Sequence, residues 1–163
     1  MKPVTTSLAV ALVLASPIAF ADGKACDLTS PEELQPLLGA KPSLKPSIQP
    51  NGVEVCAGKV GQSTVTIRYY AKKDDAESEK EEARLDKLKA AGATIETRKV
   101  GGMNCMELRP GGKATRQAYT TSCSTPTTSR LPKYAVIEVS NPSQAFEMKQ
   151  VSPIAQGIAG RLY

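Results

Sequence analysis

The chain has 163 residues, contains no histidine and carries a formal charge of +5. Without histidine it lacks the usual general base of serine and cysteine enzymes. The charge excess is mild and forms no polybasic block, which argues against a dedicated nucleic-acid-binding protein.

The N-terminus has the features of an export signal. Lys2 gives a positive start, residues 8–15 are apolar, and Ala19-Phe20-Ala21 is a small-x-small cleavage site. The apolar run is shorter than the roughly 20 residues that span a bilayer, so we expect no stable membrane anchor. We therefore predict a signal peptide at residues 1–21 and one periplasmic or secreted domain at residues 22–163.

The first half of this domain predicts a helix, a hairpin and a second helix. Ser30-Pro31-Glu32-Glu33 combines an N-cap, a first-turn proline and a capping box, and Gly39 can end the helix. The proline-containing stretch 40–49 predicts a surface loop. Residues 53–60 and 63–71 alternate as hairpin strands, and the highly charged segment 72–91 predicts a solvated helix.

The second half predicts four strands and a final helix. The expected strands are residues 93–100, 103–108, 117–123 and 134–139, and Ser152-Pro153 is expected to open the helix. The order α-ββ-α-ββββ-α predicts an α+β fold, in which helices pack on one face of an antiparallel sheet.

Four cysteines, Cys26, Cys56, Cys105 and Cys123, are expected to form two disulfides after export. No two of them are closer than 18 positions, which excludes a Cys-x-x-Cys redox motif, and a zinc site would need clustered ligands. Cys105 and Cys123 fall on successive predicted strands, which favours Cys105–Cys123 and Cys26–Cys56. The two other pairings remain open.

A ligand surface is the clearest functional candidate. By strand alternation we place Arg68, Tyr70, Arg98 and Tyr134 on the outward face of the sheet, as speculative ligand-binding residues. An ordinary solvated sheet face is the alternative, because tyrosine and arginine are compatible with strands anyway. The sequence offers no catalytic residues, no metal site and no cofactor motif.

The segment Cys26-Asp27-Leu28-Thr29-Ser30-Pro31-Glu32-Glu33-Leu34, followed by Leu38-Gly39, resembles the start of small actinobacterial exported lipoproteins of unknown function. Their mature domains often begin Cys-Asp-Leu-Leu-Thr, and a second cysteine follows on a strand. The resemblance implies a PsbP-like α+β domain with a Cys26–Cys56 bridge. It covers about 30 residues and implies no activity. This chain departs from the family because it lacks the lipid-attachment cysteine.

Together these features predict an exported, non-enzymatic domain with a binding or accessory role in the cell envelope. Its partner would be an envelope component or another exported protein. A secreted inhibitor of another exported protein and an unrecognised hydrolase are the alternatives. Binding of an anionic envelope component through Arg68 and Arg98 is a further possibility, which predicts affinity that falls with added salt.

Overall fold

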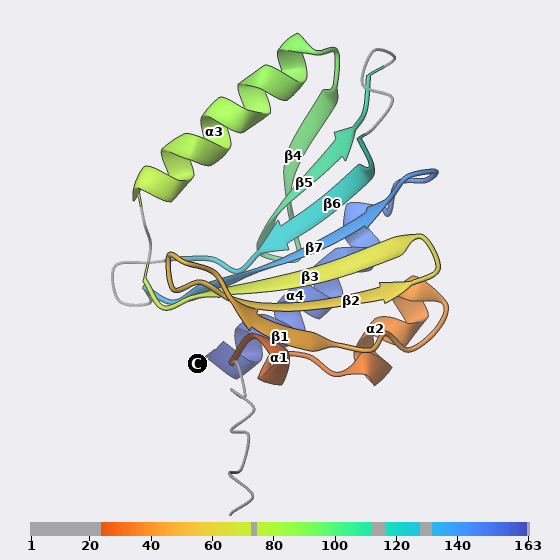
Figure 1. Cartoon of the computed structure of the whole chain (residues 1–163), viewed down its shortest axis with the longest axis vertical. Helices are drawn as coiled ribbons and strands as arrows, with labels where there is room; N and C mark the ends of the chain where they lie inside the picture. Colours follow the sequence, from red (N-terminus) through yellow and green to blue (C-terminus); the bar gives the residue numbers. More distant parts are fainter. Residues whose placement is uncertain (1–23, 73–74, 112–116, 128–131, 163) are drawn as a thin grey trace, which may run out of the picture.

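Seven antiparallel strands form one sheet in the computed structural model, which describes residues 24–72, 75–111, 117–127 and 132–162 (Figure 1). The predicted α+β class with an antiparallel sheet is therefore confirmed. The predicted signal peptide lies outside the described residues. The elements, in chain order, are α1 Lys24–Asp27, α2 Pro31–Leu38, β1 Lys45–Ile48, β2 Glu54–Val60, β3 Ser63–Tyr70, α3 Asp75–Ala90, β4 Thr94–Val100, β5 Met103–Arg109, β6 Tyr119–Ser124, β7 Tyr134–Asn141 and α4 Met148–Leu162.

The sheet joins two groups of consecutive strands. Its order is β1-β2-β3-β7-β6-β5-β4, so the N-terminal meander meets the C-terminal one where β3 pairs with β7. A two-residue turn sets the register of one hairpin in each meander. The predicted Gly61-Gln62 turn joins β2 to β3, with Val60 opposite Ser63, and Gly101-Gly102 joins β4 to β5.

Helix α2 has the predicted ends. The Ser30 hydroxyl accepts a hydrogen bond from the Glu33 backbone N–H, and the Glu33 carboxylate accepts one from the Ser30 N–H. Gly39 closes the helix at φ 83°, a conformation that glycine adopts without strain. The one-turn helix α1, which precedes α2, was not predicted.

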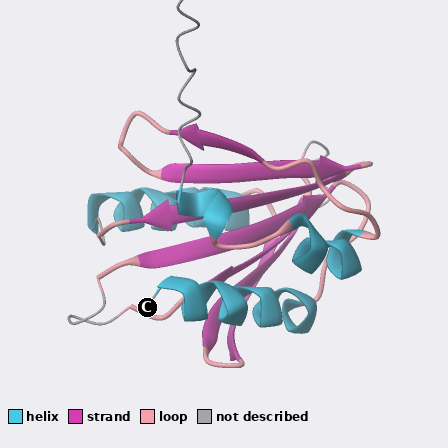
Figure 2. Cartoon of the chain, turned by 90° about the horizontal axis from the view of Figure 1, so that it is seen from below, coloured by secondary structure: helices cyan, strands magenta, loops and turns pink. Residues whose placement is uncertain are grey.

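Helices α1, α2 and α4 lie on one side of the sheet (Figure 2). Helix α4 contacts β5, β6 and β7, and α1 contacts β2 and β3. The sheet directs Val65, Ile67, Ile137 and Val139 toward them, and these side chains are almost fully buried. The alternation predicted for β3 and β7 therefore describes the sheet correctly, and the hydrophobic core lies on this inner face.

Helix α4 begins earlier than predicted. It starts at Met148, and Pro153 lies inside the helix, not at its start. Met148 and Val151 are both buried, so the extra turn adds apolar surface to the core. This gain offsets the single backbone hydrogen bond that Pro153 cannot donate.

Two further expectations differ from the structure. The predicted loop at residues 40–49 contains β1, an edge strand that pairs with β2 despite Pro46. Edge strands tolerate proline because one side of the strand makes no ladder hydrogen bonds. The packing of all helices on one face is not confirmed, since α3 contacts the edge strand β4 and stands apart from the layer formed by α4 (Figure 1).

Candidate functional site

Two of the predicted ligand-binding residues form a stacked pair. Tyr70 of β3 lies directly opposite Tyr134 of β7, and their rings are parallel within 2°, with centroids 4.3 Å apart. Their neighbours Tyr69 and Ala135 point into the core, so the pair lies on the opposite side of the sheet. We call this side the outer face; it also carries Arg68, Val136 and Glu138. Both tyrosines are half-buried.

Arg68 lies beside the tyrosines and is already paired. Its Nη1 donates to Oε2 of Glu138 at 3.2 Å, and both side chains are about three-quarters buried (27% and 28% exposed). Arg84 of α3 joins this electrostatic environment. Its hydrogen bonds to Glu81 raise its pKa, and the charge of Glu138 adds a smaller increase. The outer face therefore holds a partly desolvated ion pair next to an aromatic stack.

An open hollow of about 400 Å³ continues the outer face across β6, β5 and β4. The strand register links it to the tyrosine side, because Ser122 lies opposite Glu138 and Ser124 lies opposite Val136. Its lining combines uncharged polar residues with two cations and two sulfur-containing residues: Thr97, Asn104, Ser122, Ser124, Arg98, Lys99, Cys105 and Met106. Apart from Arg98, these residues were not predicted from the sequence, although the alternation of Thr120, Ser122 and Ser124 with buried neighbours was the signal that could have found part of this surface.

Arg98 does not join Arg68 and the tyrosines. It lies directly opposite Cys105, whose side chain points into the core, so the two share the inner face. The expectation that Arg98 faces outward with Arg68 is therefore wrong. Edge position explains the error: on the inner side of β4, Val100 packs against the core, but Arg98 is exposed and polar, as outward side chains are elsewhere.

Arg98, which also borders the outer hollow, lines a second hollow of about 350 Å³ on the inner side, next to the start of α4. Three carboxylates reach it, and each has its own cation: Glu96 with Arg98, Glu107 with Arg109, and Glu147 with Lys149. The pKa of Arg109 is raised by its hydrogen bond to Glu107, and that of Lys149 by its hydrogen bond to Glu147. Carboxylates neutralised in this way are poor candidates for the free acid and base of a hydrolase.

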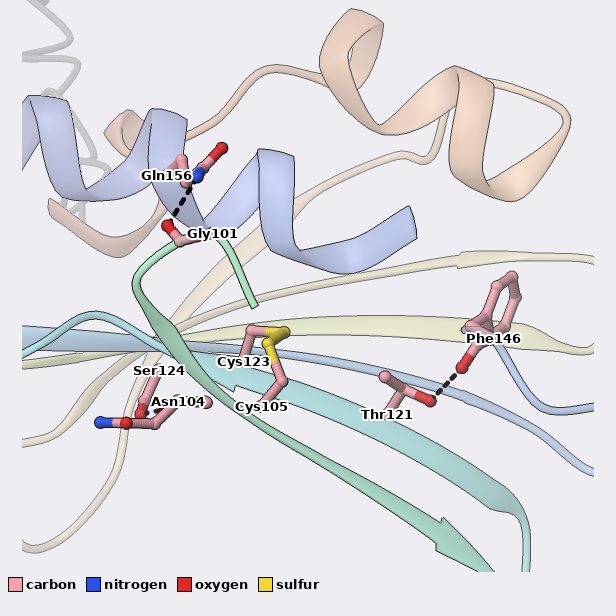
Figure 3. Close-up of a disulfide and its surroundings, with 8 residues drawn as sticks. All are labelled: Gly101, Asn104, Cys105, Thr121, Cys123, Ser124, Phe146 and Gln156. Atoms are coloured by element: carbon pink, nitrogen blue, oxygen red, sulfur yellow. Dashed lines mark hydrogen bonds between the residues drawn. A yellow bond between two sulfur atoms is a disulfide. The ribbon is translucent and has the colours of Figure 1, made fainter. Parts of the chain in front are cut away.

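Both disulfides have the sequential pairing that the sequence favoured. Cys26 is joined to Cys56, and Cys105 to Cys123, with Cα–Cα distances of 5.0 and 4.1 Å. The second bond links directly opposite residues of β5 and β6 and points toward α4, while Asn104 and Ser124 lie on the other side of these strands (Figure 3). The cysteines are thus structural cross-links that fit an oxidising compartment.

No family model, curated protein or solved structure matched the chain. Within the described ranges, no helix has the length and apolar character needed to cross a membrane. In the same part of the chain, no three acidic or cysteine side chains come together as a metal-ligand group. The geometry of the two sheet faces is therefore the basis for a functional hypothesis.

Proposed function

We propose that this chain is an exported, non-enzymatic domain of the cell envelope that binds another exported or envelope protein through its outer face. The observation that carries the proposal is the Tyr70–Tyr134 stack beside the Arg68–Glu138 pair. Tyrosine and arginine are the residues that protein interfaces favour at their centres, because they combine a large contact area with polar ends.

The shape of this surface supports a protein partner better than a small molecule. Small-molecule sites are concave and bury most of their ligand, whereas the hollow on the outer face is open, and its lining combines short polar residues with Arg98, Lys99 and Met106. A charge-driven site for an anionic envelope component has weaker support. Arg68 is paired with Glu138, and Arg98 lies on the other face of the sheet.

Site-specific photo-crosslinking tests the proposal. A photoreactive phenylalanine is placed at Ser122, on the outer face, or at Lys149, an exposed position of α4, and each protein is incubated with an envelope extract of its source. We expect a discrete protein adduct from position 122 and none from position 149. Tyr70→Ala together with Tyr134→Ala should abolish the adduct while the circular dichroism spectrum is retained.

Three outcomes would contradict the proposal: no adduct from position 122, equal adducts from both positions, or an adduct that survives loss of both tyrosines. The captured protein also distinguishes the inhibitor alternative. If it is an enzyme, stoichiometric addition of this chain should lower its activity in the inhibitor case and leave it unchanged in the accessory case.

A further inference from the structure

The two edges of the sheet differ in how well they are protected. At one edge, β1 has only four residues and includes Pro46, which has no N–H to offer an incoming strand. At the other edge, β4 has seven residues without proline, and among the described residues its strand partner is β5, on one side alone. An edge of this length leaves backbone donors and acceptors that a further strand can pair with.

The side chains of β4 are complementary to a second copy of β4. In an antiparallel pair related by a two-fold axis, directly opposite residues lie on the same face of the sheet. Placing Thr97 opposite Thr97 of the second copy pairs all seven residues and puts Glu96 opposite Arg98 twice. Moving the two-fold axis by one residue along β4 puts Glu96 opposite Glu96 of the second copy in one direction, and Arg98 opposite Arg98 in the other. One register is thus selected by charge.

In the single chain the two charged side chains Glu96 and Arg98 are paired with each other along the same strand. Across the β4–β5 pair, Glu96 lies directly opposite Glu107, and like charges in that arrangement are destabilising. Glu96 takes its counter-charge from Arg98 of the same strand, while Arg109 neutralises Glu107 at 2.7 Å. Glu96 and Arg98 are 44% and 65% exposed, so both can reach across the edge.

We propose that two copies of this chain associate through β4 in the Thr97-centred register, forming a continuous antiparallel sheet across a two-fold axis. Each Glu96 then has an arginine of the second copy on the side that is open in the single chain. This association uses the edge and the inner side of β4, and does not require the tyrosine part of the outer face.

A charge swap, measured by sedimentation of the exported protein, tests the register. Glu96→Arg alone and Arg98→Glu alone each create two like-charge contacts in the dimer, and each should raise the dimer Kd by about tenfold or more. The double variant E96R/R98E restores both opposite-charge contacts and should return Kd close to that of the unmodified protein. A monomer at millimolar concentration, or a dimer indifferent to the single reversals, would overturn the proposal.

Cysteine cross-linking gives a second measurement that does not depend on the charges. Thr97→Cys places two thiols opposite each other at a Cα–Cα distance of about 4.5–5.5 Å, within the range of a disulfide. It should form covalent dimers under mild oxidation. Thr94→Cys is the matched control, because it faces Val100 of the second copy and should not cross-link. Equal cross-linking of the two variants would contradict the register.

Discussion

Arg161, near the end of α4, forms an ion pair with Glu33, the residue that completes the capping box of α2. The same guanidinium donates to the carbonyl oxygen of Leu28 at 2.8 Å, and Thr29 donates to the Glu33 carboxylate at 3.1 Å. One carboxylate thus caps the start of α2 and connects this helix to α4. The contact holds the N-terminal segment against α4.

Removing this connection should destabilise the fold. Arg161→Ala loses the bonds to both Glu33 and Leu28, and because both partners are partly exposed we expect a loss of about 1–2 kcal/mol in the free energy of unfolding. Urea denaturation of the oxidised protein measures it. Lys41→Ala is the control: it breaks the more exposed pair with Glu32 and should cost clearly less than Arg161→Ala. Equal losses would show that the Arg161 contacts add nothing beyond a surface ion pair.

The pH dependence of stability should report on Glu33. The hydrogen bond from Arg161 is the largest cause that lowers its pKa, and the N–H of Ser30 and the hydroxyl of Thr29 lower it further. Because the folded-state pKa lies below the unfolded value, the ionised carboxylate stabilises the fold at neutral pH. This stabilisation declines as the pH falls below about 4.3 and is gone below the folded-state pKa.

Glu33→Gln removes this titration. The difference in unfolding free energy between the natural protein and the variant should therefore be largest at neutral pH and shrink as the medium is acidified. Denaturation curves recorded from neutral to strongly acidic pH measure the difference. A difference that is constant across this range would contradict the assigned ionisation.

A close contact between two glycines attaches α3 to the sheet. Gly111 follows β5, and a Cβ atom built there would collide with the carbonyl oxygen of Gly92, just after α3, and lie 2.9 Å from its Cα. Both obstacles are backbone atoms, so Gly111→Ala should cost about 1–3 kcal/mol. Gly160→Ala in α4 meets no atom within 4 Å and should stabilise the protein by about 0.5–1 kcal/mol. Thermal unfolding distinguishes them, and a neutral Gly111→Ala would show that this contact can relax.

The two disulfides should contribute similar stability. Cys26–Cys56 joins residues 30 apart and Cys105–Cys123 joins residues 18 apart. Each should add about 3 kcal/mol by restricting the unfolded chain, with the longer loop adding about 0.5 kcal/mol more. Replacing both cysteines of one pair by alanine, then of the other, measures the two values by urea denaturation. A much larger loss for Cys105–Cys123 would assign its effect to packing between β5 and β6 instead of loop closure.

The sequence by itself determined the local features of this protein. The capping box at Ser30 and Glu33 and the two-residue turn at Gly61-Gln62 follow from interactions within a few residues, and the alternation along β3 marks its buried side. Such interactions act before tertiary contacts form, so local patterns predict them well. The outward positions of Tyr70 and Tyr134 belong to the same class.

The tertiary structure alone decided which residues of different strands are neighbours. The opposition of Tyr70 and Tyr134, 64 positions apart, depends on β3 pairing with β7, which no local pattern encodes. The side of the sheet on which Arg98 lies follows from the register of β4 with β5, which places it opposite the buried Cys105. Exposed positions of an edge strand look alike on both faces, because alternation identifies a strand's faces only where one of them is buried.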